Sequence, residues 1–177
     1  SYDQEVTLPD GRKVTRQSYG GDHGEFPHDG IFCIKGVIYS DRTPTPLYAE
    51  IRKAQQNADF TFAGLTEDKK FVRVNIRNKN LFTNLSEFDG SWQLTEEGSK
   101  VVAQGTFAPV AAPRQHTEIL IPIESAGEKF CPDRVYFLTV NLHLKVDTNW
   151  AEKGYVVATE QLPLPEALTG FNPAEKM

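Results

Sequence analysis

The chain has 177 residues, a formal net charge of −5 and a hydrophobic fraction of 39%. This composition is typical of a globular protein that is large enough to bury a core. Its Lys and Arg residues are scattered singly, which argues against a nucleic-acid-binding surface, and no apolar run has the length of a membrane-spanning helix. We therefore expect neither nucleic acid nor a membrane among its partners.

Neither the start of the chain nor its cysteines fix a compartment. Residue 1 is Ser and no signal-peptide pattern follows it, so we expect a processed or cut N-terminus. Cys33 and Cys131 lie far apart and make no disulfide framework. A pairing of Cys33 with His28 as nucleophile and base is conceivable. The apolar neighbours of Cys33 favour a buried, inert thiol instead.

Residues 1–45 are rich in Gly, Asp, His and Pro, which predicts a loop-rich extension. Residues 22–29 form its densest polar cluster, with two histidines and three carboxylates. Their spacing matches no closed zinc pattern. Nothing in the sequence positions Asp22, Glu25 or Asp29 as the acid and nucleophile that a glycosidase needs. We interpret the cluster as a loop whose polar groups satisfy one another or face a cleft.

One amphipathic helix is predicted over residues 46–57. Thr45 is a favourable N-cap, and Pro46 suits the first helical position. The apolar residues recur at spacings of four and three, which predicts a one-faced helix of about three turns. They are Leu47, Ile51 and Ala54. We expect this helix to connect two parts of the molecule and to pack on a neighbouring surface.

The rest of the chain, up to residue 165, alternates apolar and polar residues in short segments separated by Gly and Pro. We predict strands over residues 59–62, 71–77, 91–95, 101–107, 117–123, 135–147 and 155–164. Trp92 falls on the third of them, where immunoglobulin-like sandwiches often bury a Trp. The predicted fold class is all-β, an immunoglobulin-like antiparallel β-sandwich of about seven strands with a loop-rich N-terminal extension and one short helix.

Three polar or aromatic residues of the sandwich are candidates for function. Trp150 lies in a turn between two predicted strands and would suit stacking on a sugar, but it would equally lock the turn onto the core or dock a neighbouring domain. His116 and His143 stand singly in strands, and we predict that both are surface histidines.

Several strings in the chain form a recognisable signature. They are Tyr19-Gly20-Gly21-Asp22, His28-Asp29, Phe32-Cys33-Ile34-Lys35-Gly36-Val37, Asp41-Arg42-Thr43-Pro44-Thr45-Pro46, Ser91-Trp92, Thr148-Asn149-Trp150-Ala151 and the segment 154–161. Together they resemble the end of the catalytic barrel of β-galactosidases of glycoside hydrolase family 2, followed by their fourth, immunoglobulin-like domain.

The resemblance implies a division of the chain into the barrel tail (1–45), the connecting helix (46–57), the sandwich (58–165) and a tail (166–177). The parent would hydrolyse terminal β-D-galactosides with retention, using two glutamates that lie upstream of the matched stretch, as do the primary magnesium ligands. We therefore expect no catalytic residue in this chain and no activity from it alone. Its expected partners are the remaining domains and the parent's galactoside. A homo-oligomer is left open, as is a cytoplasmic or periplasmic location in a bacterium.

The resemblance also implies an active-site rim made by His28, Asp29, Phe32 and Lys35. In the family, the backbone carbonyl at the position of Phe32 helps to hold a sodium ion, and an Asn at the position of Lys35 is a second ligand. A Lys ammonium group has only donors, so we expect its amine to replace the sodium. His28 also stands where an Asn is usual, near a weaker magnesium site. For this chain alone we expect no cofactor, and for its parent magnesium.

Two other functions remain open on the sequence. A stand-alone carbohydrate-binding sandwich would need an exposed aromatic platform, for instance from Phe88, Trp150 or Tyr155. A complete small hydrolase would have to use the carboxylates of residues 22–29. The linker interpretation predicts neither sugar binding nor turnover by the isolated chain, the second function predicts binding, and the third predicts turnover.

Overall fold

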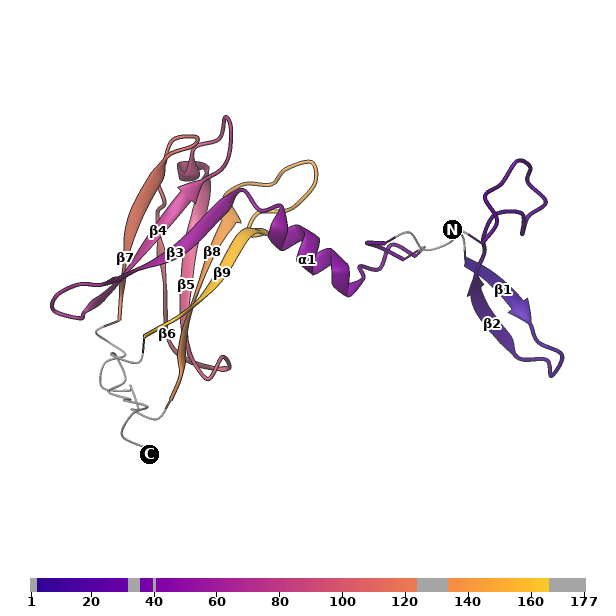
Figure 1. Cartoon of the computed structure of the whole chain (residues 1–177), viewed down its shortest axis with the longest axis horizontal. Helices are drawn as coiled ribbons and strands as arrows, with labels where there is room; N and C mark the ends of the chain where they lie inside the picture. The colour runs from indigo at the N-terminus through magenta and orange to yellow at the C-terminus, as the bar shows by residue number, and fades with distance from the viewer. Residues whose placement is uncertain (1–2, 32–35, 40, 124–133, 166–177) are drawn as a thin grey trace. The chain divides into compact units, whose positions relative to one another are not determined.

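The computed structural model describes residues 3–31, 36–39, 41–123 and 134–165 of the chain (Figure 1). The chain forms two compact units, Ser1–Gln55 and Gln56–Met177. In the described residues, no helix has both the length and the apolar character needed to cross a bilayer. Every buried hydrophobic side chain among them belongs to the second unit, between Ala58 and Leu164.

The first unit begins with a β-hairpin that the loop-rich interpretation did not predict. Strands β1 (Asp3–Thr7) and β2 (Lys13–Gln17) pair antiparallel, with Val6 opposite Val14. The turn between them contains Gly11 at φ 82°, a conformation that a glycine adopts at little cost. An Asp-Gly pair between two short alternating runs is a strong local hairpin signal, and Asp10-Gly11 carries it here.

Helix α1 (Pro46–Ala54) ends three residues before the predicted limit. Thr45 occupies the N-cap position, but its hydroxyl donates to the carbonyl oxygen of Val37 at 2.9 Å and makes no capping bond. Beyond the helix, Gln56 is buried and its side-chain oxygen accepts the backbone N–H of Thr159 at 3.1 Å. This bond fixes Gln56 in the sandwich, so the helix ends before it. No residue of α1 is buried.

The second unit is an antiparallel sandwich whose seven strands confirm the seven that the sequence predicts. One sheet has the order β3-β4-β7 and the other β6-β5-β8-β9 (Figure 1). The strands are β3 (Ala58–Leu65), β4 (Phe71–Asn78), β5 (Phe88–Glu96), β6 (Lys100–Phe107), β7 (His116–Pro122), β8 (Tyr136–Leu144) and β9 (Val156–Pro163). A single 3₁₀ turn, η1 (Leu85–Glu87), precedes β5.

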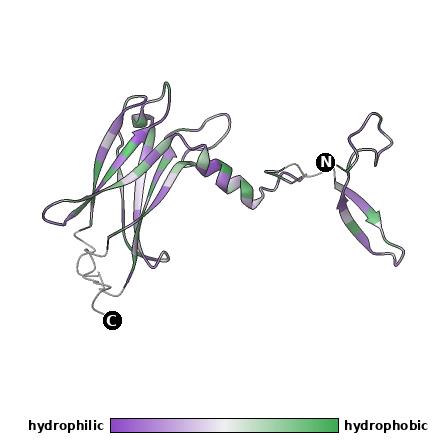
Figure 2. Ribbon diagram, viewed as in Figure 1, coloured by the Kyte–Doolittle hydropathy of each residue, from purple (hydrophilic) through white to green (hydrophobic). Residues whose placement is uncertain are grey.

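Hydrophobic and hydrophilic residues alternate along the strands, as the colouring of Figure 2 shows. Because alternate side chains point to opposite faces, this pattern places the core between the two sheets. In β8 every second residue from Tyr136 to Leu144 is buried, and the residues between them are half-buried. The predicted apolar face extended to Val146, and this was wrong. Val146 is exposed because the strand already ends at Leu144.

Two glycines of the four-stranded sheet leave room for aromatic rings that pack in the core. Trp92 is buried, as predicted, and stands opposite Gly105, where an added Cβ would lie 2.8 Å from the indole nitrogen. Gly90 stands opposite Phe107, and an added Cβ there would strike the ring. A Cβ at either glycine would collide with the ring, so each glycine and its aromatic partner form one packing unit.

Candidate functional site

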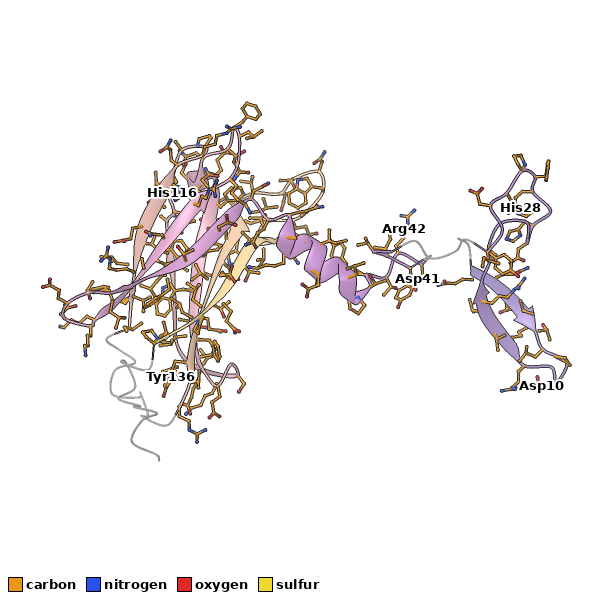
Figure 3. The ribbon with its side chains drawn as sticks, viewed as in Figure 1. Asp10, His28, Asp41, Arg42, His116 and Tyr136 are labelled. Atoms are coloured by element: carbon orange, nitrogen blue, oxygen red, sulfur yellow. The ribbon has the colours of Figure 1, made fainter. Side chains whose placement is uncertain are left out.

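The polar cluster of the first unit lies in one compact loop, residues 18–31, which we call the polar loop. The N–H of Gly20 donates to the carbonyl oxygen of Gly30 at 2.9 Å and closes the loop. Gly21, at φ 93°, lies directly under the ring of His28, whose Nε2 would be 2.9 Å from an added Cβ. The lack of a side chain at Gly20 and Gly21 therefore leaves room for His28, which is labelled in Figure 3.

Two of the three carboxylates in this loop accept hydrogen bonds from its backbone N–H groups. Glu25 accepts the N–H groups of Gly21 at 2.8 Å and His23 at 3.0 Å, and the bond from Gly21 is the main cause that lowers its pKa. Asp22 accepts the N–H of Tyr19 and lies 3.3 Å from the guanidinium of Arg16. A glycosidase acid needs a raised pKa, so Glu25 is poorly suited to that role.

The two histidines of the polar loop also have hydrogen-bond partners within the loop. His28 accepts the N–H of Gly30 on Nδ1 at 3.1 Å, and Nε2 of His23 lies 3.1 Å from the hydroxyl of Ser18. In the described parts of the chain, no three His, Cys, Asp or Glu side chains are grouped as a metal site. Asp29 is exposed beside His28.

The remaining predicted rim residues, Phe32 and Lys35, lie outside the described residues, as do Cys33 and Cys131.

A tight turn follows at the Asp-Arg-Thr-Pro string (Figure 3). The carboxylate of Asp41 accepts the N–H of Thr43 at 2.8 Å, and this bond lowers the pKa of Asp41. Arg42 takes a left-handed conformation at φ 69°, and the N–H of Tyr39 donates to the carbonyl oxygen of Thr43 at 2.9 Å. The string therefore has a local structural role, because Asp side chains bond their own backbone two residues on.

On the sandwich, Trp150 stands in the turn after β8 and is 62% exposed. Its ring meets Tyr155 edge to face, with centroids 5.5 Å apart. The prediction for His116 is confirmed, since it is exposed. His143 is instead half-buried, because Nε2 lies 2.7 Å from the hydroxyl of Ser91 on the neighbouring strand and Nδ1 lies 3.1 Å from the carbonyl oxygen of Gly154.

Sequence comparison matches both parts of the chain to known families. The family model for β-galactosidase domain 4, a non-catalytic domain, matches residues 74–165, just over half of the chain. The model for the TIM barrel domain of family 2 glycosyl hydrolases matches residues 4–60. A solved structure of a protein from Archaeoglobus fulgidus covers 61% of this chain at 9% identity and a TM-score of 0.32, a likeness too low to support an argument.

Curated relatives carry the same family name. The β-galactosidase of Priestia megaterium is 35% identical over 91% of this chain, that of Psychromonas ingrahamii is 37% identical over 92%, and that of Clostridium acetobutylicum is 35% identical over 96%. The chain spans 15%, 15% and 18% of the length of these relatives. On the strength of the two family matches and these relatives, the chain belongs to the β-galactosidases of glycoside hydrolase family 2.

Proposed function

We propose that this chain is a non-catalytic linker and scaffold region of a larger β-galactosidase that hydrolyses terminal β-D-galactosides with retention. The order of the two family matches carries this proposal, because the residues that match the barrel (4–60) precede those that match domain 4 (74–165) in one chain. The catalytic glutamates and the primary magnesium ligands then belong to parts of the parent outside this chain. In this arrangement, residues 46–57 connect the barrel tail (1–45) to the sandwich (58–165).

Among the described residues of the first unit no hydrophobic side chain is buried, which supports a barrel-tail assignment. Phe26 is 90% exposed and Ile31 is 83% exposed. Large apolar side chains normally find cover in a complete domain, so these two are suited to packing against the rest of a barrel. Residues 1–45 then contribute to the parent's active-site rim without supplying its acid or nucleophile.

Within that rim we assign His28, Asp29, Phe32 and Lys35 to the surroundings of the sugar. The backbone of the polar loop holds His28, and Asp29 beside it is exposed. Lys35 has only hydrogen-bond donors, so it is unsuited to hold a sodium ion with the carbonyl of Phe32 and suited to donate to a sugar hydroxyl. The parent should therefore be active without sodium. Strong activation of the parent by sodium chloride over potassium chloride would contradict the assignment of Lys35.

The decisive experiment is hydrolysis of a chromogenic β-galactoside by the isolated chain, with calorimetric titration of galactose and lactose. We expect neither turnover nor heat of binding. Turnover would mean that Asp22, Glu25 or Asp29 performs catalysis and would overturn the proposal.

Binding without turnover would favour the second candidate function, a carbohydrate-binding module. The observation that favours this candidate is the exposed ring of Trp150 beside Tyr155. Trp150→Ala should then abolish the binding, whereas Phe88→Leu, on the half-buried ring at the start of β5, should leave it unchanged.

A further inference from the structure

We propose that one end of the sandwich docks onto the part of the catalytic barrel that lies outside this chain, an inference that rests on the proposed function. We call this surface the apolar end. It is defined by five exposed side chains in three loops, Leu81, Phe82, Val110, Val146 and Trp150. The loops are residues 79–87 between β4 and β5, residues 108–115 between β6 and β7, and residues 145–155 between β8 and β9.

Hydrogen bonds between the loops show that they share one end of the sandwich. The ammonium group of Lys145 donates to the carbonyl oxygen of Ser86 at 2.6 Å and joins the third loop to the first. The amide of Asn78, at the end of β4, donates to the carbonyl oxygen of Ala111 at 2.9 Å. This bond joins the second loop to the residue that directly precedes the first loop. In Figure 1 these loops lie at the end of the sandwich where β3 begins.

The loop that carries Phe82 is held by a fully buried asparagine. Asn78 is 0% exposed, and besides its bond to the second loop it donates to the carbonyl oxygen of Thr83 at 2.9 Å. Its own side-chain oxygen accepts both the backbone N–H and the side-chain amide of Asn80. The hydrogen bonds of Asn78 therefore fix the conformation of the loop, although its Phe82 side chain is 91% exposed. An ordered loop that presents a bare aromatic ring is pre-organised for a contact.

The loop that carries Trp150 is built in the same way. Thr148 closes it with two bonds to Ala151, one from its backbone N–H and one from its hydroxyl, both 2.9 Å long and both to the carbonyl oxygen. The N–H of Lys153 donates to the carboxylate of Asp147 at 2.7 Å. Trp150 itself touches Tyr155 edge to face, at an interplanar angle of 85°. This contact orients the indole within the loop, while the rest of the ring remains exposed.

The path of the chain identifies the barrel as the occupant. Residues matching the barrel family run to residue 60, three residues into β3. Ala58 pairs with Asn78, so β3 begins at the apolar end. A TIM barrel has about 250 residues, whereas the match covers residues 4–60. The polypeptide of the barrel therefore joins the sandwich at the end that presents Phe82 and Trp150, and this short connection gives the contact a high effective concentration.

Hydroxyl-radical footprinting of the isolated chain and of the full gene product tests the docking. Labelling of Phe82 and Trp150 should fall at least about fivefold in the gene product, because the centre of an interface excludes solvent. Leu120 is the matched control, since it is also exposed but lies on β7, outside the three loops. Its labelling should be the same in both proteins.

Three results would overturn the proposal. One is equal labelling of Phe82 and Trp150 in both proteins. Another is protection in the isolated chain that grows with protein concentration, which would make a second copy the occupant. The third is protection of Trp150 in the isolated chain by galactose, which would make the loop a sugar site. These results do not test the linker function itself. That function fails if the isolated chain hydrolyses a galactoside, which is measured without any labelling.

Paired variants of the gene product give a second readout. Phe82→Ala with Trp150→Ala should lower the urea unfolding midpoint of the isolated chain only slightly, because Phe82 is exposed and Trp150 loses little besides its contact with Tyr155. In the gene product the same pair should speed proteolytic cleavage between barrel and sandwich several-fold relative to Leu120→Ala. Equal cleavage rates in the two variants would contradict docking at the apolar end.

Discussion

Gly105 leaves room for the indole of Trp92 on the neighbouring strand, and an added methyl group would lie 2.8 Å from its nitrogen. Gly105→Ala should therefore lower the free energy of unfolding by about 1–3 kcal/mol, because a close-packed core resists added volume. Urea unfolding of the isolated chain measures this change.

A double-mutant cycle separates the collision from other effects of the glycine. In a Trp92→Leu background the same Gly105→Ala change should cost much less, since the ring that it strikes is gone. An equal cost in both backgrounds would show that the contact with Trp92 is not the cause.

Glu25 gives the polar loop a dependence on pH. Its pKa lies below the usual 4.5, chiefly because the carboxylate accepts the N–H of Gly21. A carboxylate with a lowered folded-state pKa contributes stability above its unfolded value and loses it as the pH falls through the folded value. The NMR shifts of the Gly21 and His23 amide protons should therefore move below pH 4.5, as the carboxylate of Glu25 takes up a proton. In Glu25→Gln, which has no carboxylate to titrate, this change should disappear; amide shifts that moved in the same way in both proteins would contradict the assignment.

At the level of single residues, the sequence predicted where polar side chains gather better than it predicted their hydrogen-bond partners. It identified residues 22–29 as a polar loop, but the hydrogen bonds of Glu25 depend on where the turn places the N–H groups of Gly21 and His23. The polar alternation of β8 suggested a surface His143. Only the register that sets β5 beside β8 brings Ser91 within 2.7 Å of it. Asn78 gave no signal, because its partners at positions 111 and 112 are distant in sequence.

At the level of elements, the alternation in β8 makes a direct prediction. Leu138 is buried at the centre of the strand, whereas Thr139 faces outward and is half-buried. Leu138→Ala should cost about 2–5 kcal/mol through lost burial and the cavity left behind. Thr139→Ala should cost less than about 1 kcal/mol, the span of strand propensities. Unfolding by urea measures both, and comparable losses would mean that the two faces of β8 are not distinguished as the structure describes.

Elements with a strong period were predictable and their ends were not. All seven strands of the sandwich follow from alternation, since side chains on a strand point to opposite faces in turn. The end of α1 depends on a bond between Gln56 and Thr159, which no local pattern encodes. The hairpin of β1 and β2 did have a local signal in Asp10-Gly11, but the Gly and Pro content around it was interpreted as loop.

At the level of the whole molecule, the two units should differ in stability. Among the described residues, buried hydrophobic side chains occur only in the second unit, so hydrophobic burial stabilises the described part of the first unit much less. Amide hydrogen exchange of the isolated chain should be slow in β4 and β8 and fast in β1, β2 and α1. Uniformly slow exchange would contradict a barrel tail that depends on the rest of its domain. In the full gene product, the same three elements β1, β2 and α1 should gain protection.

The sequence by itself determined the sandwich, the seven strands and the family, because period-two alternation and the motif strings are local properties of the chain. The tertiary structure alone decided which side chains accept hydrogen bonds from the backbone of the polar loop and which aromatic side chains remain exposed. Hydrogen-bond partners and exposure depend on residues brought together from distant positions, as Asn78 and Ala111 are. For the same reason only the tertiary structure places the loops that carry the exposed Phe82 and Trp150 at one end of the sandwich.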